Sequence, residues 1–177
     1  MGIEILLIIQ IGFEMAKIIK VKNVLKNKER KKLIKDCQPF LTDGEELGKM
    51  FPGSQYPGKQ TTANLHEYPQ FVDVCQYILS LSIKKLKIKK LHLIKSWINC
   101  LDGKNTAMHN HHPHDYSIVY YIKTFPLLNS GTFFKDYGLV RCPQNGLIIF
   151  PSYLYHSNPS YPFGLNRYTL AMDLKVD

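Results

Sequence analysis

The spacing of apolar residues divides the chain into a helical first half and a strand-rich second half. Over residues 27–41 the apolar positions recur at helical spacing until Pro39 ends the pattern, and Asn27 is suited to cap this helix. A second helix is predicted over 69–81, with Pro69 in its first turn. The residues expected to face inward from it are Phe71, Val74, Cys75, Ile78 and Leu79.

From residue 93 onward the pattern changes to short runs of β-branched and aromatic residues separated by Gly, Pro and Asn. The predicted strands are 93–99, 117–123, 131–135, 147–150 and 167–174. Short strands of this kind assemble into two antiparallel sheets that close over a pocket. We therefore predict a mainly β fold with N-terminal helices, arranged as a jelly-roll barrel.

The chain length predicts one domain over residues 1–177. Residues 15–92 are expected to form a helical and loop part that packs on the barrel, whose core is 93–177. Within the first part, residues 42–64 are rich in Gly, Pro, Ser, Thr and Gln and are predicted to be a long irregular loop. The apolar segment 1–14 is interpreted as an extension, with Met15 as an alternative start of the chain.

A lysine-rich segment, residues 83–94, interleaves lysines with isoleucine and leucine. It fits either a basic helix on nucleic acid or membrane, or a helix end followed by a half-buried strand with solvated lysines; we favour the second. The formal net charge is +9, and 17 of the 23 basic residues lie in 15–95. Nucleic acid is therefore a weakly supported partner, because no aromatic stacking pattern accompanies the charge.

Targeting signals are missing from the pattern, since the apolar start is too short to span a bilayer and lacks the features of a signal peptide. We predict no membrane association and a cytoplasmic location, in the host cytoplasm if the protein is viral. The four cysteines, at 37, 75, 100 and 142, form no Cys-x-x-Cys pair. They are predicted to be buried free thiols rather than a disulfide framework or a zinc ribbon.

Candidate chemistry begins with a histidine cluster, because four of the seven histidines fall within residues 109–114. If the chain is extended there, His109 and His111 point to the same side, about 7 Å apart. Two imidazoles on one face can bind one metal ion. Asp115, four residues beyond His111, could add an oxygen ligand.

Two later segments carry residues that could complete such a site. Gly146 suits a turn into the strand 147–150, and His156 follows that strand as a predicted third ligand. A turn-rich linker would then let 167–174 run antiparallel beside the His156 segment. Arg167 and Thr169 share one face of that strand, and a buried guanidinium needs an anion, which a planar carboxylate fits best. The alternative is an Arg167 side chain on the surface.

Together these segments resemble the non-haem Fe(II)- and 2-oxoglutarate-dependent dioxygenases, and within them a small 2OG-Fe(II) oxygenase group found in bacteria and phages. The resemblance spans roughly residues 50–174. The matching pieces are S-W-I-N (96–99), H-N-H-H-P-H-D-Y-S-I-V-Y-Y-I (109–122), S-G-T-F-F (130–134), G-L-I-I-F-P-S-Y-L-Y-H (146–156) and R-Y-T-L (167–170), with an upstream echo in G-K-Q-T-T-A-N-L (58–65).

This resemblance implies a double-stranded β-helix barrel, cupin-like, that holds Fe(II) and uses 2-oxoglutarate and O2. It implies a hydroxylase-like enzyme that couples oxidative decarboxylation of 2-oxoglutarate to hydroxylation of a substrate. His109 and His156 would be catalytic metal ligands, and Arg167 would bind the far carboxylate of 2-oxoglutarate. The helpers implied for cosubstrate binding are Thr169 and Tyr120 or Tyr121.

Several alternatives stay open. His111 stands where most of these enzymes have Asp or Glu, so either His111 or Asp115 could be the third ligand. A cupin-type metalloprotein that works without 2-oxoglutarate, or a non-enzymatic basic binding module, would fit the same barrel. The substrate could be a protein side chain, an amino acid or a nucleobase, and the oligomeric state is open. The aromatic residues that could wall the pocket, or belong to ordinary core, are Trp97, Phe133, Phe134 and Phe150.

Overall fold

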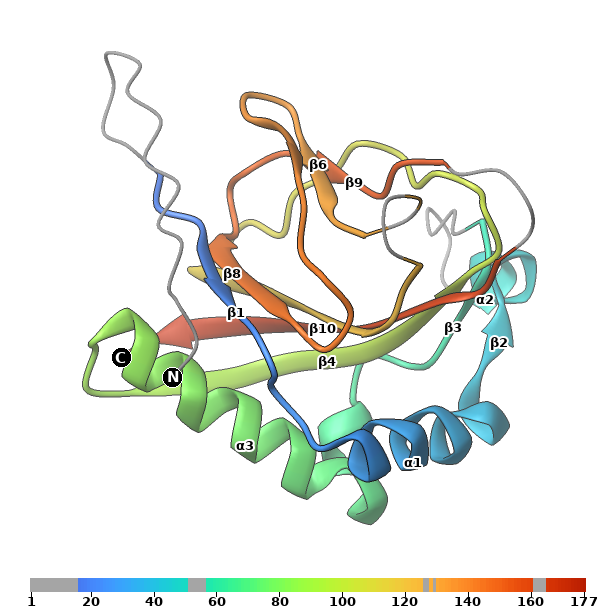
Figure 1. Cartoon of the computed structure of the whole chain (residues 1–177), viewed down its shortest axis with the longest axis horizontal. Helices are drawn as coiled ribbons and strands as arrows, with labels where there is room; N and C mark the ends of the chain where they lie inside the picture. The colour runs from blue at the N-terminus through green and yellow to red at the C-terminus, as the bar shows by residue number, and fades with distance from the viewer. Residues whose placement is uncertain (1–15, 51–56, 126–127, 129, 161–164) are drawn as a thin grey trace.

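The structure, a computed structural model, describes residues 16–50, 57–125, 128, 130–160 and 165–177. It is mainly β, with helices in the first half of the chain, as the pattern predicts (Figure 1). The segment 1–14 and the alternative start at Met15 lie outside the described residues.

The larger of two sheets has seven strands, and all of its neighbouring strands run antiparallel. In order across the sheet they are β1 (Ile19–Val21), β8 (Leu147–Pro151), β5 (Tyr116–Lys123), β10 (Arg167–Val176), β4 (Leu91–Leu101), β3 (Lys59–Gln60) and β2 (Thr42–Asp43). The long strands β4, β10 and β5 form its centre, and each contains β-branched and aromatic residues, which favour strands.

The smaller sheet has three antiparallel strands in the order β7 (Gly138–Val140), β6 (Thr132–Phe134) and β9 (His156–Ser157). It lies over one face of the large sheet, while α1 and α3 lie under the other face (Figure 1). A small buried cluster fills the space between the two sheets. Its described members include Tyr121, Phe134, Ile148 and Phe150.

The helices cover the second face of the large sheet through a larger apolar core. The helical elements are α1 (Asn27–Cys37), η1 (Gln38–Phe40), α2 (Gly44–Met50), η2 (Leu65–Glu67) and α3 (Pro69–Leu86). Along α3 the predicted inward positions Phe71, Cys75, Ile78 and Leu79 are buried and Val74 packs against them, which confirms the helical period.

Several helices begin or end at residues other than those predicted from the sequence. The helix predicted to end at residue 81 continues to Leu86, where Lys87 takes a left-handed conformation with φ 58°. Asn27 is already helical, and the Glu29 carboxylate accepts a bond of 2.8 Å from the Lys26 N–H at the helix start. The segment 83–94 forms a helix end followed by β4, and Lys84, Lys87, Lys89 and Lys90 are exposed, in agreement with the favoured interpretation.

The segment 42–64 is not an irregular loop throughout, because it contains β2, α2 and β3. These elements are too short to show an apolar period, and backbone pairing with β4 holds β3 in place. Residues 51–56 of this segment lie outside the described ranges. The return of the chain also differs, since β10 pairs with β4 and β5 rather than with the His156 strand.

The four cysteines are free and buried, as predicted. Burial raises the pKa of the Cys37 and Cys142 thiols to about 12, so they stay protonated and unreactive near neutral pH. Of the helices in the described ranges, none combines the length and apolar character needed to cross a bilayer.

Candidate metal centre

The histidine cluster is brought to the small sheet by backbone pairing. The N–H groups of His109 and His156 each donate to the other residue's carbonyl, at 3.0 and 2.8 Å. The His111 N–H donates to the Ser152 carbonyl at 2.8 Å, two residues from His109 along an extended segment. This segment therefore runs antiparallel to the chain around β9 and carries two imidazoles toward His156.

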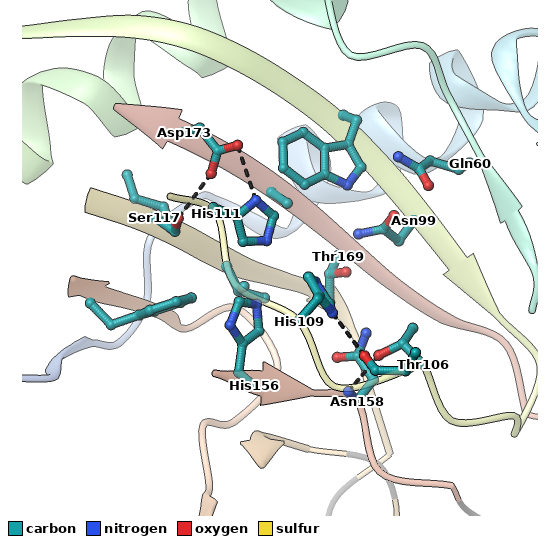
Figure 2. A pocket seen from close by; sticks show the side chains of 16 residues that line it. Gln60, Asn99, Thr106, His109, His111, Ser117, His156, Asn158, Thr169 and Asp173 are labelled. Atoms are coloured by element: carbon teal, nitrogen blue, oxygen red, sulfur yellow. Dashed lines mark hydrogen bonds and ion pairs between the residues drawn. The ribbon is translucent and has the colours of Figure 1, made fainter. Parts of the chain in front are cut away.

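The three imidazoles of His109, His111 and His156 converge in the space between the sheets (Figure 2). Their ring centroids lie 4.6–5.1 Å apart. One potential ligand atom from each ring lies within 4.8 Å of the others. Nitrogens bound to one ion at about 2.1 Å lie roughly 3–4 Å apart, so this His triad could hold a metal ion after small side-chain adjustments.

Each imidazole of the His triad has an acceptor at Nδ1. The Ala107 carbonyl lies 2.8 Å from His109 Nδ1, the Leu154 carbonyl lies 2.9 Å from His156 Nδ1, and Asp173 Oδ2 lies 3.0 Å from His111 Nδ1. An acceptor at Nδ1 keeps the proton there and leaves Nε2 with a lone pair for a metal. The donor set therefore fits a divalent transition-metal ion such as Fe(II).

Burial also keeps two of these rings neutral. It lowers the pKa of His156 to about 3, with His109 adding to the effect, and it lowers the pKa of His109 in the same way. Only a neutral imidazole can bind a metal ion, so burial favours the ligand form of both side chains.

Asp115 takes no part in the His triad. Its carboxylate accepts a bond of 2.8 Å from the Val176 N–H and one of 3.3 Å from Lys175 Nζ, and these contacts hold it, partly exposed, beside the end of β10. The geometry thus brings His111 rather than Asp115 to His109 and His156. Asp115 is therefore not placed to be the third ligand.

A different carboxylate, Asp173 on β10, stands directly behind His111 (Figure 2). It is 2% exposed. Ser117 Oγ donates to Asp173 Oδ1 at 2.9 Å, and Ser117 and Ser152 share a hydroxyl hydrogen bond of 2.8 Å. His114 Nε2 lies 3.8 Å from the same oxygen that contacts His111.

The His triad lies in a pocket of about 410 Å³. Strand register arranges the pocket floor in rows across β5, β10 and β4. In the first row Asp173, which contacts His111, pairs with Ser117. In the second row Ala171 lies between Val119 and Trp97 and makes the row apolar. In the next row Thr169 lies between Tyr121 and Asn99, with Gln60 of β3 opposite Asn99. All of these except Tyr121 line the pocket.

Arg167 begins β10, on the same face as Thr169 and about 7 Å further along the strand. It is 1% exposed, which rules out the surface alternative. Its guanidinium carbon lies 5.2 Å from the centre of the Tyr121 ring, and the Tyr121 hydroxyl hydrogen-bonds Thr132 Oγ1 at 2.7 Å. Arg167 is not among the residues that line the 410 Å³ pocket, whereas Thr169 is.

The two candidate tyrosines fall on opposite faces of β5. Tyr121 lies between the sheets with Arg167, but Tyr120 belongs to the core between the large sheet and the helices. The Tyr120 hydroxyl donates to Asn145 Oδ1 at 2.8 Å. Alternation along β5 therefore separates Tyr120 from the pocket, and the expectation that it helps bind a cosubstrate is wrong.

The aromatic candidates also divide by position. Trp97 and Phe150 line the pocket, and the Trp97 ring stacks on His111 with centroids 5.4 Å apart. Phe134 is a core residue whose ring lies 5.8 Å from that of His156. Phe133 points to the outer face of the small sheet and is 38% exposed, because neighbouring strand residues alternate in direction.

The sequence interpretation missed Asp173, Ser117, Asn99 and Gln60. The alternation that placed Arg167 and Thr169 on one face continues to Asp173, so that signal was present. Asn99 is 7% exposed, and its Oδ1 atom has no hydrogen-bond partner among the described residues. Its role depends on its neighbours across the sheet, which sequence spacing does not reveal.

No protein-family model matches the sequence, and no curated protein matches it either. Solved structures do match. SnoN, a non-haem α-ketoglutarate-dependent epimerase from nogalamycin biosynthesis, superposes with a TM-score of 0.69 at 11% identity, over 89% of this chain and 76% of SnoN.

Two further structures show the same likeness. A prolyl-4-hydroxylase of Pseudomonas putida superposes with a TM-score of 0.60 at 15% identity, over 90% of this chain and 92% of the hydroxylase. HygX of Streptomyces hygroscopicus, solved with nickel and 2-oxoglutarate bound, gives a TM-score of 0.60 at 11% identity, over 89% of this chain and 82% of HygX. At these identities the likeness concerns the fold.

Proposed function

Because the chain has the fold of the Fe(II)- and 2-oxoglutarate-dependent oxygenases, we propose that it is an enzyme of that kind. It couples oxidative decarboxylation of 2-oxoglutarate to hydroxylation of a second substrate. Its two sheets form the double-stranded β-helix barrel of these enzymes, with residues 93–177 as the barrel core.

One observation carries the proposal: the His triad and a buried arginine occupy the same inter-sheet space. His109, His111 and His156 converge within 4.8 Å, and Arg167 is buried on the same face of β10 that forms the pocket floor. A metal centre alone would need no buried cation nearby. A cosubstrate with a carboxylate at its far end needs one.

Each group has an assigned role in this proposal. His109, His111 and His156 would hold Fe(II), and Fe(II) with 2-oxoglutarate would supply the activation of O2. Arg167 pairs with the far carboxylate of 2-oxoglutarate, and Tyr121 and Thr169 lie beside it to hydrogen-bond the same group. Trp97 and Phe150 form apolar walls that limit access of water to the reacting groups.

The polar side chains of the pocket indicate how a substrate could be bound. Its one carboxylate, Asp173, is bonded to His111 and Ser117. The Asn99 and Gln60 amides also line the pocket and are available to hydrogen-bond an uncharged polar group of the substrate.

The test is an anaerobic Fe(II) reconstitution of the full chain followed by measurement of succinate formed from 2-oxoglutarate on addition of O2. We expect Fe-dependent succinate formation that falls at least ~100-fold in His109→Ala and His156→Ala, because two ligands no longer retain the ion. His112→Ala is the matched control, since His112 is an exposed histidine of the same segment. If both triad variants form succinate at the parent rate, the proposal is wrong.

A further inference from the structure

Asp173, the carboxylate of the pocket lining, is used by no ligand assignment. It is 2% exposed on the pocket face of β10, and both carboxylate oxygens are engaged. A buried carboxylate is costly unless it is paired and hydrogen-bonded, so its surroundings indicate what it does.

Asp173 lies closer to the His111 ring than to the His114 ring. Oδ2 lies 3.0 Å from His111 Nδ1, and His114 Nε2 is farther from the same oxygen, at 3.8 Å. Oδ1 accepts from Ser117, which is held in turn by Ser152. The two serines fix the carboxylate plane, and the carboxylate fixes the orientation of His111.

Fixing His111 matters more than fixing the other two histidines. His109 and His156 donate Nδ1–H to carbonyl oxygens of residues two positions away, and they pair with each other through their backbones. His111 has no such local acceptor among the described residues. Its Nδ1 partner comes from a strand 62 positions away in sequence, and its other ring contacts are Trp97, His109 and His156.

We infer that Asp173 is a positioning residue for the proposed metal centre. It keeps the proton of His111 on Nδ1, directs Nε2 toward the ion, and supplies from behind the ring the negative charge that a carboxylate ligand would have provided. A triad of three neutral imidazoles adds no charge of its own. Asp173 compensates by making His111 a stronger donor, as carboxylates behind metal-bound histidines do in general.

This inference rests on the His triad being the metal site, and Co(II) binding to the metal-free full chain tests both. Titration is followed by the visible absorption of bound Co(II), whose shape depends on ligand geometry. We expect Asp173→Ala to raise the Co(II) Kd about 10- to 100-fold and to change the band shape. Asp173→Asn, which can keep an acceptor but not the charge, should raise it by less than Asp173→Ala.

Two further variants separate positioning from a general effect on structure. Ser117→Ala leaves the carboxylate in place but removes the hydroxyl that donates to its Oδ1. It should weaken Co(II) binding less than Asp173→Ala does. Asp115→Asn is the matched control, because that carboxylate lies two residues before Ser117 but contacts Val176 and Lys175. Its Co(II) Kd should stay within about twofold of the parent value.

Thermal unfolding supplies a readout that a merely structural role would not produce. A neutral amide costs less to bury than a carboxylate of the same shape, so the Tm of metal-free Asp173→Asn should equal or exceed that of the parent. The rise in Tm on adding Co(II) should shrink, because that rise reports metal affinity. If Asp173→Ala does not fold, Asp173→Asn carries the test.

The outcomes are distinct. Parent-like Co(II) affinity and band shape in both Asp173 variants would overturn the role of Asp173 and leave the His triad intact as the metal site. A parent protein that binds no Co(II), or one that binds it equally well after His109→Ala, would overturn the His triad and this inference with it.

Discussion

The two faces of strand β10 are both buried, but against different parts of the molecule. Its even-numbered residues belong to the core between the large sheet and the helices α1 and α3; they are Tyr168, Leu170, Met172 and Leu174. Its odd-numbered residues begin with Arg167 and point between the sheets. All eight positions from 167 to 174 are buried, so exposure does not distinguish the faces.

Chemistry distinguishes them instead. The helix-side face is apolar apart from the Tyr168 hydroxyl, and its burial stabilises the fold without further partners. The pocket-side face has a guanidinium, a hydroxyl and a carboxylate at Arg167, Thr169 and Asp173, each of which is costly to bury for stability alone. Strand β10 therefore serves the fold through one face and the candidate site through the other.

The largest effect is expected from Leu170→Ala on the helix-side face. Leu170 is fully buried in the larger core, so the truncation should lower the free energy of unfolding by about 2–5 kcal/mol. Chemical denaturation measures the loss. The Co(II) Kd of the folded fraction should not change, and a weakened Kd would show that the faces are not independent.

The next effect concerns Arg167 on the pocket-side face. Loss of hydrogen bonds to a charged group costs about 1.5–3 kcal/mol, so Arg167→Ala should raise the KM for 2-oxoglutarate roughly 10- to 150-fold. Succinate formation against 2-oxoglutarate concentration measures this. Arg141→Ala, at an exposed arginine, is the control, and an unchanged cosubstrate dependence in Arg167→Ala would remove Arg167 from the site.

The same two faces explain what could be read from the sequence. Alternation along a strand is local, so it correctly grouped Arg167 with Thr169, and clustering correctly joined His109 with His111. The helical period likewise gave the inward face of α3. These features depend on residues close together in sequence, and each appears as a period of 2 or 3.6.

Features set by long-range register could not be read in this way. Alternation says that Tyr120 and Tyr121 face opposite sides but not which side is covered by helices. The pairing of β10 with β4 and β5 depends on competition among all strands, and the linker composition suggested a wrong neighbour. Asp173 gains its meaning only from His111, which lies 62 positions away.

The smallest expected effect is the response of the metal-free protein to acid, which concerns the pocket-side histidines. In the metal-free protein, burial holds the pKa of His156 at about 3, below its ordinary value of 6.5. The unfolded chain therefore binds a proton that the folded one excludes, and stability present above pH 6.5 is lost as pH falls toward 3. The lowered pKa of His109 adds in the same direction.

Thermal unfolding of metal-free protein between about pH 7 and 5, a window above the ordinary carboxyl pKa values, measures the response of the histidines, and the difference between the parent and His156→Gln isolates this contribution. We expect the parent Tm to fall across the window and His156→Gln to flatten that fall, because the residue that must stay neutral is gone. His112→Gln, at an exposed histidine, should keep the parent slope.

The helix-side face offers no group that titrates in this window among its described core residues, so Leu170→Ala should lower Tm by a similar amount at each pH. If His156→Gln retained the full parent slope, the acid response would have to be reassigned from the pocket to another part of the chain.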